Sequence, residues 1–225
     1  MSDLNALVSA IADSGSAAPV KFRQGAIVTV NTDSTANVTI AGSTTTITNV
    51  KVASHVCPIP GATCWLATDG RDWFVFATLG PTGPAFGTMR KSTAQNITSA
   101  AFTELAWGSR TDTTANGMAL GSTGITVVVP GIYSVSANID LDASSTAGSR
   151  YGVLYLNGAI VAQGNGGSAP SSATFNSRMG ATAILKLVPG DIVNAGMYQN
   201  GGATYPTAVG AGYNVLSAVW IGPSA

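Results

Sequence analysis

Apolar and polar residues alternate through most of this sequence, in short runs that end at glycine, proline, asparagine or aspartate. Residues 151–163, YGVLYLNGAIVAQ, show the pattern, because Asn157-Gly158 separates two such runs. Alternation with a period of two places every second side chain on one face of a strand, and Asn-Gly favours a tight hairpin turn. The pattern therefore predicts an all-β protein.

The composition restricts the partners that such a protein can have. Only 9% of the 225 residues are charged, and ten basic residues balance ten acidic ones. Typical globular chains carry about 25% charged residues. A chain without net charge has no field that attracts phosphate backbones or acidic lipid surfaces. We expect neither nucleic acid nor membrane as a partner, and we expect an assembly subunit whose surface is covered by other proteins.

The N-terminal segment, residues 1–18, differs from the rest. Residues 2–14 have apolar side chains at helical spacing, so they predict a short helix that docks on its own domain, on sister copies or on another protein. The apolar stripe of this predicted docking helix consists of Leu4, Leu7, Val8 and Ile11. The segment has no basic region typical of a signal peptide, and no run reaches the ~20 apolar residues of a membrane span.

The remaining sequence predicts two β domains. Residues 19–79 contain five short alternating runs, which is the size and strand number of a small barrel of the oligonucleotide/oligosaccharide-binding (OB) type. Residues 80–84, GPTGP, predict a stiff Gly-Pro linker. Residues 85–225 contain eight to ten strand-like runs with Gly-containing breaks, which indicate a jelly-roll sandwich.

The order of motifs in residues 85–225 resembles the complement globular-head and tumour-necrosis-factor-like (TNF-like) jelly rolls. The words in common are Gly131 to Tyr133 in VPGIYSVSANI, the LYLNG hairpin and LKLVPGDIV. Trp107 ends an early strand and Tyr213 begins the last one, as in that family. The family forms trimers around the inner sheets, so the resemblance implies a homotrimer here.

Residues 19–79 resemble the small OB-like domain of tailed-phage minor tail proteins. The segment runs from RQGAIVTVN through PIPGAT to DWFVFATLG, and Gly61 keeps the glycine of the middle turn, whereas Ala62 replaces the usual acid. A short helix, such a barrel, a Gly-Pro linker and a complement-like head together resemble a protein of the phage tail or tail tip.

The sequence contains few residues that could form a catalytic or metal site. His55 is the single histidine, and it could pair with Cys57 in SHVCP if both lie on one strand face. A structural zinc site needs four ligands, and His55, Cys57 and Cys64 supply three. We expect no enzyme activity and no cofactor.

Cys57 and Cys64 flank the loop PIPGAT. They are a possible disulfide, which would stabilise the fold by about 2–3 kcal/mol through the entropy of the unfolded chain. Two reduced thiols are the alternative.

Two further pairs are candidate binding residues. Asp140 and Asp142 share one face of a predicted strand and are weak candidates for a calcium site, with a solvated outer face as the alternative. Tyr198 and Tyr205 lie among amide and hydroxyl residues, which predicts contact with a receptor or glycan, with loop anchoring as the alternative. Trp107 and Trp220 are expected in the core.

These expectations combine into a trimeric structural protein of a tailed-phage virion, located in the tail or tail tip. Its N-terminal part would bind other virion proteins, and its head would contact the host surface, including cell-surface glycans. The first alternative is a trimeric capsid decoration protein on the capsid surface. The second alternative is a bacterial surface adhesin.

Overall fold

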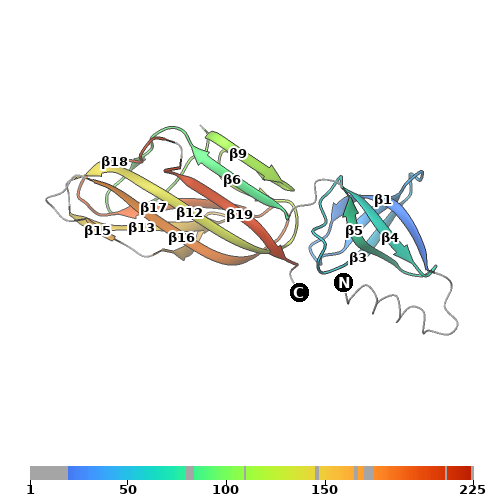
Figure 1. The fold of residues 1–225 in the computed structure, drawn as a ribbon. Coiled ribbons are helices and arrows are strands. Elements are labelled where there is room, and N and C mark those ends of the chain that lie inside the picture. Colours follow the sequence, from blue (N-terminus) through green and yellow to red (C-terminus); the bar gives the residue numbers. More distant parts are fainter. Residues whose placement is uncertain are drawn as a thin grey trace. The chain divides into compact units, whose positions relative to one another are not determined.

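The chain divides into two compact units, Met1–Thr82 and Gly83–Ala225 (Figure 1). The computed structural model describes residues 20–79, 84–108, 110–144, 147–164, 167–169, 175–210 and 212–223. The predicted docking helix with Leu4, Leu7, Val8 and Ile11 lies outside the described residues, as do residues 80–83 of the predicted linker. The described residues contain no helix that could span a membrane.

Unit 1 is a closed five-stranded barrel, as the five alternating runs predict. Its strand order is β1-β2-β3-β5-β4, with β4 returning to β1. The β3–β5 pair is parallel and the other pairs are antiparallel. The strands are β1 (Lys21–Val30), β2 (Ala36–Ile40), β3 (Thr46–Val52), β4 (Thr63–Thr68) and β5 (Trp73–Leu79).

The barrel closes around small and branched apolar side chains. Ile27, Val38, Leu66 and Val75 are each at most 1% exposed and come from four different strands. Side chains of alternate residues on each strand point into the barrel, and branched apolar side chains fill its narrow interior. The barrel therefore accounts for the period of two in the sequence.

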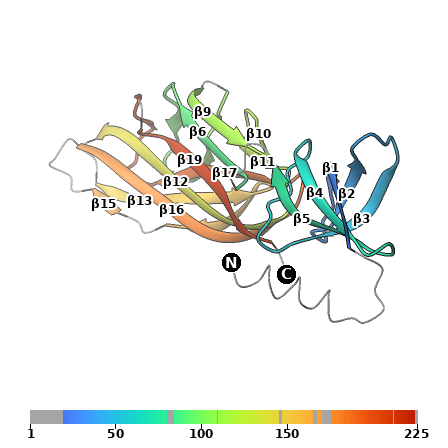
Figure 2. The same cartoon turned by 45° about the vertical axis from the view of Figure 1, so that its right-hand side comes forward.

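Unit 2 is a sandwich of two sheets, seen in two orientations in Figures 1 and 2. Sheet I has the order β16-β12-β19-β6-β9. Its strands are β6 (Phe86–Lys91), β9 (Arg110–Asn116), β12 (Gly131–Ser144), β16 (Phe175–Leu187) and β19 (Val215–Gly222).

Sheet II has the order β10-β11-β17-β13-β14, with β8 paired to β17 and β15 paired to β13. Its strands are β8 (Ala101–Glu104), β10 (Met118–Leu120), β11 (Ile125–Val127), β13 (Gly148–Leu156), β14 (Ala159–Gln163), β15 (Gly167–Ala169) and β17 (Ile192–Gln199). A small separate pair joins β7 (Asn96–Ile97) to β18 (Tyr205–Pro206). The two five-strand paths, with neighbours far apart in sequence, form the predicted jelly roll.

Residues of the sequence motifs in unit 2 make hydrogen bonds that stabilise its turns and its core. The hydroxyl of buried Tyr133 donates to the carbonyl of Val129 at 2.5 Å. The carboxylate of Asp191 accepts the backbone N–H of Val188 and the side-chain amide of Asn157, each at 2.8 Å. Asp191 therefore fastens the β16–β17 turn to the β13–β14 hairpin, and Asn157 and Gly158 of that hairpin have the positive φ angles that its tight turn requires.

Candidate functional site

The two residues considered for catalysis, His55 and Cys57, lie in the segment between β3 and β4. His55 is exposed in a turn after β3, so the strand face that it was predicted to share with Cys57 does not exist. Among the described residues, no group of three or more His, Cys, Asp or Glu side chains is arranged to hold a metal ion.

The possible disulfide is not formed, and Cys57 and Cys64 are thiols in the structure. Cys64 lies on β4 with its side chain in the barrel core, whereas Cys57 lies in the segment between β3 and β4 and is not part of that core. Burial raises the pKa of the Cys64 thiol from 9.0 to about 11.

Asp140 and Asp142 lie on β12, as predicted, but Asp140 is engaged by a guanidinium. Its two carboxylate oxygens accept Nε and Nη2 of Arg178 at 2.9 and 3.0 Å. The hydrogen bonds and charge of Asp140 raise the pKa of Arg178. A cation at the predicted calcium position would have to displace Arg178.

The outward face of sheet I carries a broad uncharged surface. Strand register places Ile184, Ser134, Val219 and Phe86 in one row across four strands. The next row consists of four hydroxyl residues, Thr182, Ser136, Ser217 and Thr88. We call these eight residues, together with Ile221, the uncharged face.

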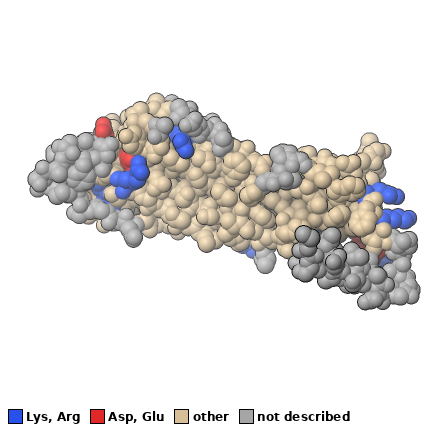
Figure 3. Space-filling model, in the orientation of Figure 1, with Lys and Arg blue, Asp and Glu red and all other residues tan. Residues whose placement is uncertain are grey.

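Three of the four apolar members of the uncharged face are exposed to solvent, and Phe86 is half-buried. Ile184 is 70% exposed, Ile221 52% and Val219 37%. Charged side chains lie at the ends of the same strands, and Figure 3 shows how few charges the visible side of the molecule carries. Exposed apolar side chains gathered on one sheet face are typical of protein–protein contact surfaces, so the uncharged face is a candidate for one.

An aromatic row crosses the outward side of sheet II. The Tyr198 ring lies between the rings of Phe102 and Tyr151, with centroids 4.9 and 5.8 Å apart. The three residues are direct partners on β8, β17 and β13. We call them the aromatic row; of its members, the sequence analysis singled out Tyr198.

Tyr205 does not join the aromatic row. Its ring lies 5.8 Å from the guanidinium of Arg150, which is fully buried and donates a hydrogen bond to Ser177. Burial lowers the pKa of Arg150. The structure therefore separates the two predicted tyrosines into an outward row and an inward, half-buried contact.

A chain of hydrogen bonds through Trp107, Asn194 and Glu104 lies beside the aromatic row. The indole of Trp107 donates to the side-chain oxygen of Asn194 at 2.7 Å, and the amide nitrogen of Asn194 donates to Glu104 at 2.8 Å. Trp107 is fully buried and Trp220 is 8% exposed, so both belong to the core as predicted. Burial and the charge of Glu104 raise the pKa of nearby Tyr155.

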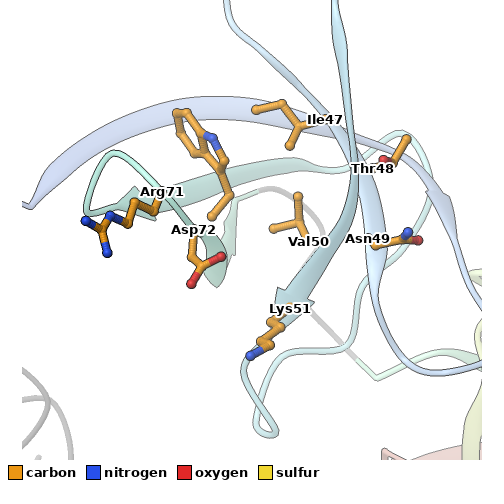
Figure 4. A pocket seen from close by; sticks show the side chains of 8 residues that line it. Ile47, Thr48, Asn49, Val50, Lys51, Arg71 and Asp72 are labelled. Carbon is orange, nitrogen blue, oxygen red and sulfur yellow. The ribbon is translucent and has the colours of Figure 1, made fainter.

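A hollow of about 170 Å³ lies in the barrel beside β3 and the β4–β5 turn (Figure 4). Lys51, Arg71 and Asp72 line it together with the ring of Trp73. The Asp69 carboxylate accepts the N–H groups of Arg71 and Asp72 at 2.8 and 2.9 Å, so the turn is well fixed. The barrel sequence contains four cationic residues, Lys21, Arg23, Lys51 and Arg71, and the hollow gathers Lys51 and Arg71.

Comparisons with known proteins find similarity at the level of structure alone. No protein-family model matches the sequence, and no curated protein sequence matches it. The strand orders of sheets I and II describe a jelly-roll sandwich. The crystal structure of murine APRIL at pH 5.0 is similar at 15% identity and a TM-score of 0.46, over 62% of this chain and 100% of that chain.

A second solved structure gives the same picture. Eiger, a TNF from S. frugiperda, is similar at 14% identity and a TM-score of 0.44, over 64% of this chain and 96% of that chain. Similarities at this level describe a fold and carry no argument about what the protein binds.

Proposed function

We propose that this chain is a structural subunit of a tailed-phage virion, a trimeric minor tail or tail-tip protein. Its N-terminal part anchors it to other virion proteins, and its jelly-roll unit contacts the host surface. The function is attachment, with no chemical turnover. The proposal joins the resemblance of the barrel segment to phage tail proteins with the surface of unit 2.

The observation that carries the proposal is the uncharged face. Val219 and Phe86 stand on neighbouring strands, and Ile184 lies in the same row on the far side of Ser134. A row of hydroxyls runs beside them, in which Thr88 and Ser217 share a hydrogen bond of 3.2 Å. Hydroxyls that hydrogen-bond to one another cost less to bury than hydroxyls left without a hydrogen-bond partner. Such a face loses little on desolvation and gains the burial of its apolar members.

A second apolar surface gives this face a partner on a sister copy. Ile160 and Val161 on the edge strand β14 are 44% and 40% exposed. A face and an edge that differ from each other make a heterologous contact, which closes into a ring when the rotation between copies allows it. The resemblance to trimeric families sets the ring at three copies.

Three copies turn weak host contacts into useful attachment. A contact of millimolar strength corresponds to about −4 kcal/mol. When three such contacts are linked in one assembly, the second and third bind at a high effective concentration. Only 9% of the residues are charged, which suits a subunit that is largely covered by its neighbours.

Two measurements test the proposal. Light scattering of the purified chain should give about three times the 22.5 kDa mass of one copy, and a mass of one copy would contradict the trimer. Mass-spectrometric stoichiometry of purified virions should find a few trimers per particle. Many copies over the whole shell would instead support a capsid decoration protein, and absence from virions would overturn the proposal.

A further inference from the structure

We propose that the aromatic row, Phe102, Tyr198 and Tyr151, is a binding site for a neutral saccharide. The ring of Phe102 stacks on the apolar face of a sugar ring, and the polar groups around the row bind its hydroxyls. The inference rests on the proposed attachment function for its biological meaning, but its chemistry can be tested on the isolated protein.

Strand pairing holds the three rings of the aromatic row side by side. Tyr198 is the direct strand partner of both Phe102 and Tyr151, and its ring is tilted by 43° and 34° to theirs. Rings stacked side by side restrict one another's rotation. The row is therefore a pre-ordered aromatic surface, and a ligand that binds it loses little side-chain entropy.

The side chain of Phe102 is exposed to solvent. Phe102 is 47% exposed on β8, which pairs with β17 alone among the described strands. The side of its ring away from Tyr198 thus faces no neighbouring strand of the described sheet. The core does not need this ring, because inward residues of β17, such as Val193 and Met197, are fully buried without it.

Polar groups lie beside the aromatic row. Glu104 follows Phe102 on the same side of β8, and its carboxylate is held by Asn194 at 2.8 Å. Ser149 and Asn200 continue the other two strands beyond the tyrosines, and the Ser149 N–H donates to the Asn200 side chain at 2.6 Å. A carboxylate, an amide and a hydroxyl bind sugar hydroxyls, and the negative charge of Glu104 disfavours acidic sugars.

The row also stays open when the protein self-associates. The uncharged face belongs to sheet I, whereas the aromatic row lies on the outward side of sheet II. A sister copy on sheet I therefore leaves the row accessible. The other proposed contact, Ile160 and Val161 on β14, lies at the edge of sheet II, three strands away from Phe102. Aromatic side chains with an exposed apolar face and neighbouring polar groups are typical of ligand-binding surfaces.

The test is saturation-transfer NMR on the full chain with methyl glucoside, methyl galactoside and N-acetylglucosamine as neutral probes and glucuronic acid as the acidic probe. At least one neutral probe should receive saturation from aromatic protons and bind more tightly than the acidic probe. The Phe102→Ala and Tyr198→Ala variants should weaken binding by about tenfold or more, whereas Phe102→Trp should retain it. Phe22→Ala is the matched control, because Phe22 is 53% exposed on the barrel and remote in sequence.

Three results of the NMR test would overturn the inference. These are no response from any neutral probe, preferential binding of glucuronic acid, or unchanged binding in both Phe102→Ala and Tyr198→Ala. Loss of binding to a host-surface protein in these variants, without sugar binding, would make the row a protein-docking site and also overturn it. Light scattering on the same samples separates the two proposals, since a trimer without sugar binding contradicts the saccharide site alone and a monomer with sugar binding contradicts the trimer alone.

Discussion

Gly131, in the motif word that suggests the jelly roll, has a local steric reason to be glycine. An added Cβ would stand 2.1 Å from Nε1 of Trp220 and 2.6 Å from the carbonyl of Gly222. The indole of Trp220 lies over this backbone and donates to the carbonyl of Pro130 at 3.2 Å. The missing side chain is thus what lets Trp220 cover the start of β12.

We predict that Gly131→Ala destabilises the protein by about 1–3 kcal/mol, because Trp220 or the β19 backbone must move. Urea unfolding of both proteins measures the difference. Gly222→Ala is the control, since a Cβ there has no heavy atom within 4 Å, and it should change stability by less than about 0.5 kcal/mol. Equal stability of Gly131→Ala and the parent would contradict the steric account.

Cys64 carries the second prediction, on thiol reactivity. Burial raises its pKa to about 11, so at pH 8 the folded protein holds it as an unreactive thiol. An aromatic disulfide reagent should label the half-buried Cys57 alone in native protein and both cysteines in denaturant without reductant. Labelling of neither in denaturant would show that the disulfide does form.

The same pKa makes stability depend on alkaline pH. The folded-state pKa of Cys64 is raised above the ordinary value of 9.0, so its contribution to stability is fully present below pH 9. It is lost as the pH rises from about 9 towards 11, because the unfolded chain then ionises more readily. Cys64→Ser should reduce this dependence in urea unfolding at pH 8 and pH 10.

Among the strands, β17 shows how one element can organise a surface. It pairs with β11, β13 and β8, and its Asn194 ties the segment around Trp107 to Glu104. The backbone repeats this attachment, because the N–H of Leu105 donates to the carbonyl of Ala195 at 2.8 Å. Asn194 is 4% exposed, so its hydrogen bonds are shielded from water.

We predict that Asn194→Ala destabilises the protein by about 1–3 kcal/mol, since it leaves the buried Trp107 N–H without its acceptor. Thermal or urea unfolding measures the change. The exposed Asn96 on β7 gives the comparison, and Asn96→Ala should change stability by less than about 0.5 kcal/mol. A small effect of Asn194→Ala would mean that the Trp107 indole finds another acceptor.

For the assembled molecule, the uncharged face makes a prediction about mass. Ile184→Asp places a charge at the most exposed apolar residue of the proposed contact, where burial of an unpaired carboxylate is strongly unfavourable. Light scattering should then give the 22.5 kDa mass of one copy in place of about three times that mass. Val28→Asp, at a 45% exposed position on the barrel, should leave the mass unchanged. An unchanged mass in Ile184→Asp would remove sheet I from the interface.

Local patterns in the sequence were enough for the strands and turns whose signals are local. The alternation of apolar and polar residues predicted β12 and β13, and Asn157-Gly158 predicted the hairpin between β13 and β14. Both signals are local, because side-chain period and turn chemistry act over a few residues. The edge strand β9, RTDTTAN, went unpredicted since it has no apolar alternation and is held by pairing with β6.

The surfaces that matter for function follow from contacts between distant parts of the chain. Phe102, Tyr198 and Tyr151 meet because β8, β17 and β13 pair in one particular register, and the rows of the uncharged face arise in the same way. A shift of one residue in either register would turn these side chains to the opposite side of the sheet. Alternation tells which side chains of one strand share a face, but not which residues of another strand lie beside them, because that depends on packing the whole sandwich.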